Sequence, residues 1–349
     1  MPDAPLITVI IPVYDVEEYL PGCLDSVLGQ QGMGQQGPGI EVIAVDDASP
    51  DRCGQILDAA AAADPRLRVV HLSENQGQGH ARNTGLELAS GEYVWFADGD
   101  DALAPGALAA IAGHLASRPD LLLIGWESAY PDRTEPGYGG ELLAAVPAAG
   151  CTLAEQPRLA ELTMTSWSKL LRRDFLGKLG VSFAAGIHED IGVTCAALLA
   201  AQSIEAVAAP CYRYRRDRGG SAMATAGAGH LAIFDSYAWV FDLVAQRQAA
   251  GIAVSDAVQA ALFERAIWHY STVLESRTTT GRLVPRRERR AFFARMHADF
   301  TARRPPGYAV PPGARGLKFR LVERGWYPVY ALAEPLNQLR VRLAALRMR

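Results

Sequence analysis

Residues 93–101 read YVWFADGDD, a short apolar run followed at once by three carboxylates around one glycine. An apolar run that ends in a turn is typical of a strand buried on both faces of a parallel sheet. Similar runs occur at Leu6–Val13, Glu41–Val45, Leu67–Leu72 and Asp120–Ile124. Helical patterns lie between them, and such alternation indicates βαβ units. We therefore predict an α/β fold with an open, mostly parallel sheet and helices on both faces.

The helical patterns also divide the chain. Four separate the predicted strands, at residues 17–28, 53–63, 79–89 and 105–115. Residues 126–160 are less regular and rich in Gly, Pro and Ala. After about residue 226 the pattern becomes helical, at 230–249, 255–274 and 286–303. A chain of 349 residues suits two domains. We expect a nucleotide-sugar-binding α/β domain at 1–225 and a helical domain at 226–349.

Composition and charge narrow the class of protein. The formal net charge of −4 is unevenly spread, because residues 281–349 contain 16 Lys and Arg but only 4 Asp and Glu. This excess makes the C-terminal region a candidate for anionic partners. The 5 cysteines show no Cys-x-x-Cys spacing, so we expect reduced, mostly buried thiols in a cytosolic protein. No signal peptide or transmembrane run is evident.

Polar residues follow three of the predicted strands. The first strand ends in Pro12-Val13-Tyr14-Asp15, the second in Asp46-Asp47, and the fourth in Asp98-Gly99-Asp100-Asp101. In an open α/β sheet the ligand lies outside the carboxyl ends of the strands. We therefore expect these clusters to meet at one edge of the sheet.

Asp98 and Asp100 stand one residue apart on a tight turn. A diphosphate leaves only if its developing charge is neutralised, which Mg²⁺ or Mn²⁺ does, and these cations prefer carboxylate and phosphate oxygens. The pair therefore predicts a site for Mn²⁺ or Mg²⁺. The alternatives are a solvated Asp-Gly turn, or a helix cap at Asp101.

Asp46 and Asp47 have two interpretations. A carboxylate at this strand end can accept hydrogen bonds from a base or a ribose hydroxyl. It can also cap the next helix, in competition with Ser49 and Asp51. We expect each interpretation to hold for different residues of this turn.

The segment Asn75–Gly85 is rich in glycine. Gly77-x-Gly79 invites a dinucleotide-binding interpretation, but Arg82 occupies the third glycine position and the segment follows the third strand. We therefore reject that fingerprint. A turn with Asn75 and Arg82 better suits contact with a base or a phosphate.

Together these segments resemble the family 2 glycosyltransferases. Four motifs match in order: Ile11-Pro12-Val13-Tyr14, Val45-Asp46-Asp47-Ala48-Ser49-x-Asp51, Asn75-x-Gly77 with Ala81-Arg82-Asn83-x-Gly85, and Asp98-Gly99-Asp100-Asp101. The resemblance covers roughly residues 6–222. It implies a GT-A fold and inverting transfer of a sugar from a nucleotide-diphosphate donor, with a UDP-sugar as the family's preference.

The resemblance implies roles for the strand-end residues. Pro12, Tyr14 and Asp47 face the base and ribose, and Asn75 and Arg82 support the nucleotide. Each of these residues stands at a motif position in this chain. For the acidic cluster, the resemblance places Asp98 near the ribose and gives the metal to Asp100.

The family pattern continues downstream through Trp167-x-Lys169-Leu170, Phe183-x-x-Gly186-x-x-Glu189-Asp190, Tyr212-x-Tyr214-Arg215 and Ser221. Trp167, Lys169, Arg215, Arg218 and Ser221 are thereby substrate-binding candidates. The loop Arg215–Ser221 is longer than a simple Arg-x-x-Ser ending, so the contact with the diphosphate stays open among Arg215, Arg216 and Arg218. We also predict that this loop is a mobile lid over the diphosphate, the alternative being a solvated linker.

Asp190 is the predicted catalytic base by the same resemblance. Inverting transfer needs a base to take the proton of the attacking hydroxyl. Glu189 and Asp190 open a predicted helix, whose N-terminal dipole favours a carboxylate. The alternative is charge complementarity at the helix start alone. For the preceding His188, we favour packing or capping over a ligand role.

Three other functions would require different sequence features. A nucleotidyltransferase would place a glycine-rich basic loop after the first strand, where this chain has Tyr14–Glu18. A non-catalytic nucleotide-sugar-binding protein would not need Asp98, Asp100 and Asp190. A processive synthase would carry transmembrane helices and a Gln-x-x-Arg-Trp motif. We expect transfer to a cell-envelope glycan or a lipid-linked acceptor, and no nucleic-acid partner.

The C-terminal tail has its own pattern. Leu332, Leu336, Leu339, Leu343 and Leu346 form one apolar stripe of a predicted helix that starts near Pro335. Four arginines surround the stripe, and Trp326, Tyr327 and Tyr330 lie just upstream. Three interpretations stay open: packing on the helical domain, peripheral contact with the inner face of the membrane, and the seam of a homo-oligomer.

Overall fold

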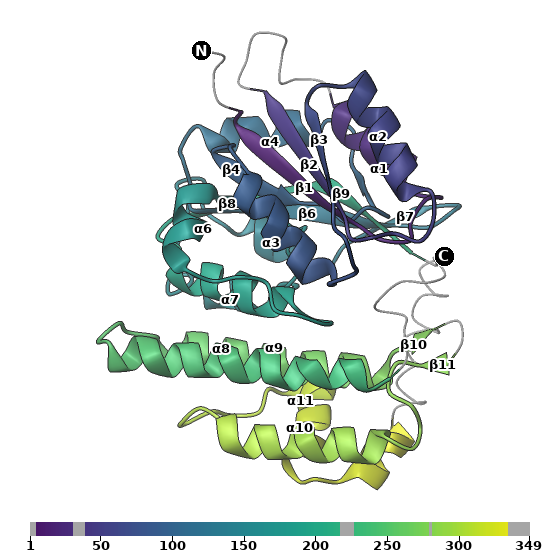
Figure 1. Cartoon of the computed structure of the whole chain (residues 1–349). Helices are drawn as coiled ribbons and strands as arrows, with labels where there is room; N and C mark the ends of the chain where they lie inside the picture. Colours follow the sequence, from purple (N-terminus) through teal and green to yellow (C-terminus); the bar gives the residue numbers. More distant parts are fainter. Residues whose placement is uncertain (1–4, 31–38, 217–226, 279–280, 334–349) are drawn as a thin grey trace. The chain divides into compact units, whose positions relative to one another are not determined.

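The computed structural model describes residues 5–30, 39–216, 227–278 and 281–333. The chain divides into two compact units, Met1–Arg218 and Gly219–Arg349 (Figure 1). The boundary predicted near residue 225 falls within 217–226, outside the described residues, and stays a prediction.

Nine strands in the described part of the first unit form one sheet, in the order β3-β2-β1-β4-β8-β6-β9-β5, with β7 paired to β6 (Figure 1). Their bounds are Ile7–Val13 (β1), Ile40–Asp46 (β2), Leu67–His71 (β3), Tyr93–Phe96 (β4), Ala102–Leu103 (β5), Leu121–Ala129 (β6), Thr134–Pro136 (β7), Lys169–Arg172 (β8) and Ile204–Arg215 (β9). The apolar runs of β1 and β4 are buried along their whole length, as expected for central strands.

Helices connect these strands as the alternating pattern predicts. Their bounds are Leu20–Leu28 (α1), Cys53–Ala63 (α2), Gln78–Leu88 (α3), Ala107–Leu115 (α4), Gly140–Ala144 (α5), Arg173–Leu179 (α6) and Asp190–Ala200 (α7). All five cysteines are free and buried, and the burial agrees with the predicted buried thiols. The predicted α/β fold class is confirmed.

The sheet is more mixed than the alternation alone suggests. The pairs β2–β3, β1–β2, β1–β4 and β6–β9 are parallel. The strand β8 lies between β4 and β6 and is antiparallel to both. Its sequence, KLLR, begins and ends with a cation and is too short to give an apolar-run signal. The antiparallel pairing in the middle of the sheet therefore comes from a strand that the apolar pattern does not predict, and the pairs β5–β9 and β6–β7 are antiparallel as well.

The strand β9 lies between β6 and β5, and its C-terminal end lies near the acidic turn that follows β4. Its pairing with β6 shifts register at Gly125, which approaches the Ala208 and Ala209 carbonyls too closely for a side chain. Beyond this irregularity, β9 pairs with β5 through Tyr212 and Arg213. Because β5 directly follows Asp101, this pairing brings the end of β9 beside the acidic cluster.

The second unit is helical, as predicted. Its helices are Ala232–Ala249 (α8), Asp256–Glu275 (α9), Arg289–Arg303 (α10) and Gly313–Glu323 (α11), and a short hairpin joins Arg277–Thr278 (β10) to Gly281–Arg282 (β11). Its core is aromatic: Phe234 packs against Tyr270 and Phe292. Among the described residues, no helix is long and apolar enough to cross a membrane.

Candidate active site

The turns after β2 and β3 are joined by the carboxylate of Asp47. Its two oxygens accept hydrogen bonds from the Gln76 and Gly77 amides, each at 2.8 Å. Asp46 instead accepts from the Ser49 amide at 3.0 Å and contacts the His71 ring at 2.9 Å. Asp47 therefore shapes the loop that leads into α3.

No side chain of the Asp46–Asp51 turn caps α2 from the N-cap position, which Arg52 occupies. Asp51, which precedes the N-cap, accepts a hydrogen bond from the amide of Cys53, the first residue of α2, at 3.0 Å. It therefore satisfies one of the free amides at the start of this helix. Ala48 has a left-handed backbone with φ of 58°. Asp15, at the end of β1, has φ of 52°. Such conformations cost free energy in residues other than glycine and concentrate at functional sites.

Three carboxylates gather after β4. One oxygen from each of Asp98, Asp100 and Asp101 lies within 4.8 Å of the others. Asp101 is buried, and it accepts from the Tyr212 hydroxyl at 2.8 Å and the Arg215 amide at 2.7 Å. The cap of α4 is Gly106, so the alternative that Asp101 caps this helix is wrong. Asp101 links the acidic turn to β9.

The two partly exposed carboxylates, Asp98 and Asp100, suit a hard cation better than Asp101 does. Burial, followed by the charges of Asp100 and Asp98, raises the pKa of Asp101 well above its usual range. Clustered carboxylates repel one another, and a divalent cation would relieve that repulsion. The donor set therefore fits Mg²⁺ or Mn²⁺.

Arg215 lies at the same cluster. Its Nε donates to the Asp100 carbonyl at 2.7 Å, and its guanidinium lies 4.9 Å from the centre of the Tyr19 ring. A positive charge is thus held beside the carboxylates. Arg218 and Ser221, and most of the predicted lid, lie outside the described residues.

Arg82 joins the acidic cluster to the start of α7. Its Nη2 donates to Asp98 at 2.7 Å, and its Nη1 is paired with Glu189. The side chain is 2% exposed. Burial alone would lower the pKa of Arg82, but Asp98, Glu189 and Asp190 outweigh that effect and raise it. Gln78 also donates to Asp98, at 2.7 Å. Contact of Arg82 with the nucleotide stays a prediction, since two carboxylates occupy its guanidinium here.

Asp190 is the first residue of α7 and is partly buried. Burial, reinforced by Glu189, raises the pKa of Asp190 to about 7, against the lowering effects of Arg82 and Lys169. Its Oδ2 accepts from the Ser166 amide at 3.3 Å. A carboxylate that titrates near neutral pH is well suited to accept a proton from a hydroxyl. His188, just before it, is buried and has φ of 67°.

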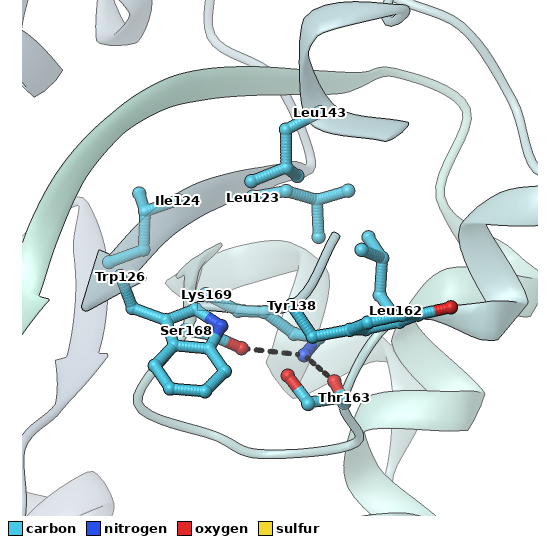
Figure 2. Close-up of a pocket in the computed structure, with 9 residues that line it drawn as sticks. All are labelled: Leu123, Ile124, Trp126, Tyr138, Leu143, Leu162, Thr163, Ser168 and Lys169. Atoms are coloured by element: carbon cyan, nitrogen blue, oxygen red, sulfur yellow. Dashed lines mark hydrogen bonds between the residues drawn. The ribbon is translucent and has the colours of Figure 1, made fainter. Parts of the chain in front are cut away.

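The segment before β8 lies against Asp190 and against β9. Trp167 stacks on Tyr212 and Tyr214, with ring centroids 4.7 and 5.5 Å apart. Lys169 is 1% exposed, and its ammonium donates to the Thr163 and Thr165 carbonyls and to the Ser168 hydroxyl. Figure 2 draws the bonds to Thr163 and Ser168. These residues are placed beside the site, and their contact with substrate stays a prediction.

The glycines of the 75–85 segment are required by backbone conformation and by close packing. Gly77 has φ of 90°, a conformation that favours glycine. A Cβ at Gly79 would lie 2.1 Å from the Ala184 carbonyl oxygen, and one at Gly85 would lie 2.4 Å from Ile10. They let α3 approach β1 and the 183–186 loop, which sets Arg82 between its partners.

The other residues predicted to contact the nucleotide differ in solvent exposure. Tyr14 and Asn75 are exposed and available to a ligand, whereas Pro12 is buried in β1. Sequence reasoning did not identify Gln78, Tyr212 or Ser166 as site residues. Tyr212 and Ser166 stand inside or beside quoted motifs, and Gln78 lies within the glycine-rich segment, so motif position is the signal that could have found them.

Residues 8–178 match the family model described as glycosyl transferase family 2. The chain is 29% identical over 225 residues to the putative glycosyltransferase EpsH of Bacillus subtilis, covering 61% of each protein. It is 43% identical over 97 residues to the putative teichuronic acid biosynthesis glycosyltransferase TuaG of the same species, covering 28% of this chain and 36% of TuaG.

A solved structure resembles most of the chain. The crystal structure of Staphylococcus aureus TarS 1-349 in complex with UDP-GlcNAc superposes with a TM-score of 0.70, covering 95% of this chain and 91% of that one. The sequence identity is 22%, so this likeness shows the fold alone. The matches cover 61% of EpsH and 36% of TuaG, so those relatives are longer than the matched region.

Proposed function

Because this chain belongs to glycosyl transferase family 2, we propose that it is an inverting glycosyltransferase that uses a nucleotide-diphosphate sugar and a divalent metal. The observation that carries the proposal is the Arg82 bridge, which ties Asp98 of the acidic cluster to Glu189, the neighbour of Asp190. The donor-binding candidates and the candidate base are thereby held in one arrangement.

The donor site in this proposal lies at the ends of β1, β2 and β4. Exposed Tyr14 and Asn75 are available to the nucleotide, and Asp47 holds the turn at Gln76 and Gly77, directly after Asn75. A UDP-sugar is our proposed donor, supported by the family resemblance and by the UDP-GlcNAc bound in the TarS crystal structure. Arg215 is our candidate for the contact with the diphosphate, because its guanidinium lies beside Asp100 and donates to the Asp100 carbonyl.

Asp100 and Asp98 would hold the metal in this proposal. When bound, Mg²⁺ or Mn²⁺ neutralises the negative charge that develops on a departing diphosphate. Asp101 anchors the turn by accepting hydrogen bonds from Tyr212 and Arg215. Gln78 and Arg82 both donate to one oxygen of Asp98, which orients that carboxylate.

Asp190 is the proposed base. In its ionised form it takes the proton of an acceptor hydroxyl as that oxygen attacks the sugar carbon from the face opposite the diphosphate. Its position at the first residue of α7 favours the ionised form, and its raised pKa makes the carboxylate a better proton acceptor. The Ser166 amide holds one of its oxygens.

A cell-envelope glycan or a lipid-linked carrier is the proposed acceptor. The printed name of TuaG, a teichuronic acid biosynthesis glycosyltransferase, supports this class. A location on the inner face of the cell membrane would bring the enzyme to such an acceptor. A nucleotidyltransferase or a non-catalytic binding protein is not favoured by the family assignment.

A thermal-shift panel tests the donor. Free nucleotide sugars are added with Mn²⁺ or with excess chelator, because a ligand that binds only the native state raises the melting temperature. We expect a UDP-sugar to give the largest shift, and chelator to reduce it. Equal shifts with and without metal would contradict the metal-dependent part. No shift with any nucleotide sugar would contradict the donor site itself.

A further inference from the structure

Lys169 is an unusual buried cation at the edge of the site. It begins β8, where it pairs with Leu123 of β6. Its Nζ donates to the Thr163 carbonyl at 2.8 Å, the Thr165 carbonyl at 2.9 Å and the Ser168 hydroxyl at 3.0 Å. These three acceptors are uncharged, and together they match the three protons of an ammonium group.

The surroundings of the ammonium are largely apolar. Figure 2 shows its nitrogen in a small pocket lined by Leu123, Ile124, Trp126, Leu143 and Leu162, with dashed bonds to Ser168 and Thr163. Burying a cation is costly unless it is well hydrogen-bonded. The 163–168 loop supplies all three acceptors, so its backbone is held against the Lys169 ammonium.

The same loop contacts Asp190 from its other side. The Ser166 amide donates to Asp190 Oδ2 at 3.3 Å. Thr194 Oγ1, one turn into α7, donates to the Asp190 carbonyl at 2.8 Å and lies 3.3 Å from the Met164 carbonyl. The loop is thus fixed between Lys169 and the first turn of α7.

We propose that Lys169 is a positioning residue for Asp190, whose ammonium group holds the 163–168 loop so that the Ser166 amide meets the Asp190 carboxylate. This inference rests on the proposed function, in which Asp190 is the base. It assigns Lys169 a role through the loop, rather than the direct substrate contact that the family resemblance implies.

Electrostatics supports the same assignment. Glu189 and Asp98 disfavour the ionised form of Asp190, whereas Arg82 and Lys169 favour it. Arg82 is already shared between Asp98 and Glu189. Lys169 is a second positive charge that favours ionised Asp190. Removing it should make Asp190 harder to ionise.

The test is a direct titration of Asp190 that needs no substrate. The full chain is labelled with carboxyl-¹³C aspartate, and the Asp190 resonance is identified by its loss in Asp190→Asn. We compare Lys169→Gln, which is neutral but keeps two donors for the loop, with Lys169→Arg, which keeps the charge. Circular dichroism verifies that each variant is folded, and Lys169→Met is a second neutral variant.

We expect the Asp190 midpoint to rise by about one pH unit in Lys169→Gln and to return toward the wild-type value in Lys169→Arg. UDP release from UDP-GlcNAc with water as acceptor should slow, with the donor KM unchanged. An unchanged midpoint in folded Lys169→Gln would overturn the proposal, as would a raised donor KM with an unmoved midpoint. Near-native transfer by Asp190→Asn would instead overturn the proposed base, which separates the two failures.

Discussion

At the scale of single residues, Arg82 has to satisfy carboxylates that are far apart in the chain. It pairs with Asp98, 16 residues away, and with Glu189, 107 residues away. A planar guanidinium can serve two acceptors at once, which a lysine ammonium does less well. With its side chain buried, Arg82 cannot move to one partner without leaving the other charge uncompensated. This one side chain therefore links the Asp98 and Glu189 carboxylates.

Replacing Asp190 by Asn tests the base. The amide has nearly the same shape but cannot take a proton, so we predict that transfer falls about 10²–10⁴-fold. Donor binding measured by calorimetry should be unchanged. Asp25→Asn, at an exposed position of α1, is the matched control and should leave both quantities unchanged. Near-native transfer by Asp190→Asn would move the search for the base to Glu189 or His188.

The pH dependence of turnover follows from the raised pKa of Asp190. The proposed base can accept a proton only when ionised, and burial raises the pKa of Asp190 to about 7. We predict that turnover at saturating donor falls about tenfold for each pH unit below about 7, and levels off above it. The rate is measured as UDP release across the acidic and neutral range. A flat profile down to the ordinary aspartate pKa would contradict this assignment.

Asp100 and Asp101 are neighbours with different predicted roles. We expect Asp100→Ala to weaken metal-dependent donor binding while leaving thermal stability nearly unchanged, because its carboxylate is partly exposed. Asp101→Ala removes the acceptor of Tyr212 and Arg215 and should destabilise the fold by about 1–3 kcal/mol. Calorimetry with Mn²⁺ and urea unfolding separate the two effects. Equal metal dependence in Asp100→Ala and wild type would remove Asp100 from the metal site.

At the scale of elements, α3 is positioned by close approach rather than by caps. Its N-cap, Gly77, has no side chain to accept a hydrogen bond. Gly79 and Gly85 instead allow contact with the 183–186 loop and with β1. This placement puts Gln78 and Arg82, one turn apart on the helix, beside Asp98. Helix position therefore decides the orientation of the acidic cluster.

Gly79→Ala tests that placement. The new methyl group would lie 2.1 Å from the Ala184 carbonyl oxygen and 3.3 Å from Glu189 Cγ. We predict a loss of about 1–3 kcal/mol in the free energy of unfolding, together with slower transfer because the Arg82–Glu189 pair is displaced. The control is Gly113→Ala in α4, which meets nothing within 4 Å and should stabilise by up to about 1 kcal/mol. Equal stability of the two variants would contradict the close-packing argument.

At the scale of the whole molecule, the excess of positive charge lies at the C-terminal end, in residues 281–349. Tyr327 and Tyr330 pack against Phe293, whereas Trp326 and Val329 are 48% and 47% exposed. Two of the three aromatics just upstream of the tail are thus packed within the second unit, and the Trp326 ring lies 4.9 Å from the Arg324 guanidinium. Residues 334–349, with the leucine stripe and its arginines, lie outside the described residues. Packing, membrane contact and an oligomer seam all stay predictions.

Liposome co-sedimentation decides between these tail interpretations. The wild-type chain is compared with a variant in which Arg340, Arg342, Arg347 and Arg349 are replaced by Gln. If the tail lies on an anionic surface, each arginine contributes about 1 kcal/mol, so the variant should bind far more weakly. Neutral vesicles and high salt are the controls. Equal, negligible binding of both proteins to anionic vesicles would exclude membrane contact, and sedimentation velocity would then test the oligomer.

The sequence alone determined the strand–helix alternation, the residues at the strand ends and the family. These features depend on neighbours in the chain: apolar runs, a carboxylate directly after a strand, and glycine where a turn needs it. Only the tertiary structure decided that β8 enters the sheet antiparallel, that Asp101 anchors β9, and that Arg82 bridges Asp98 and Glu189. Each depends on residues distant in sequence, and packing brings them together because buried charges and backbone groups must find partners.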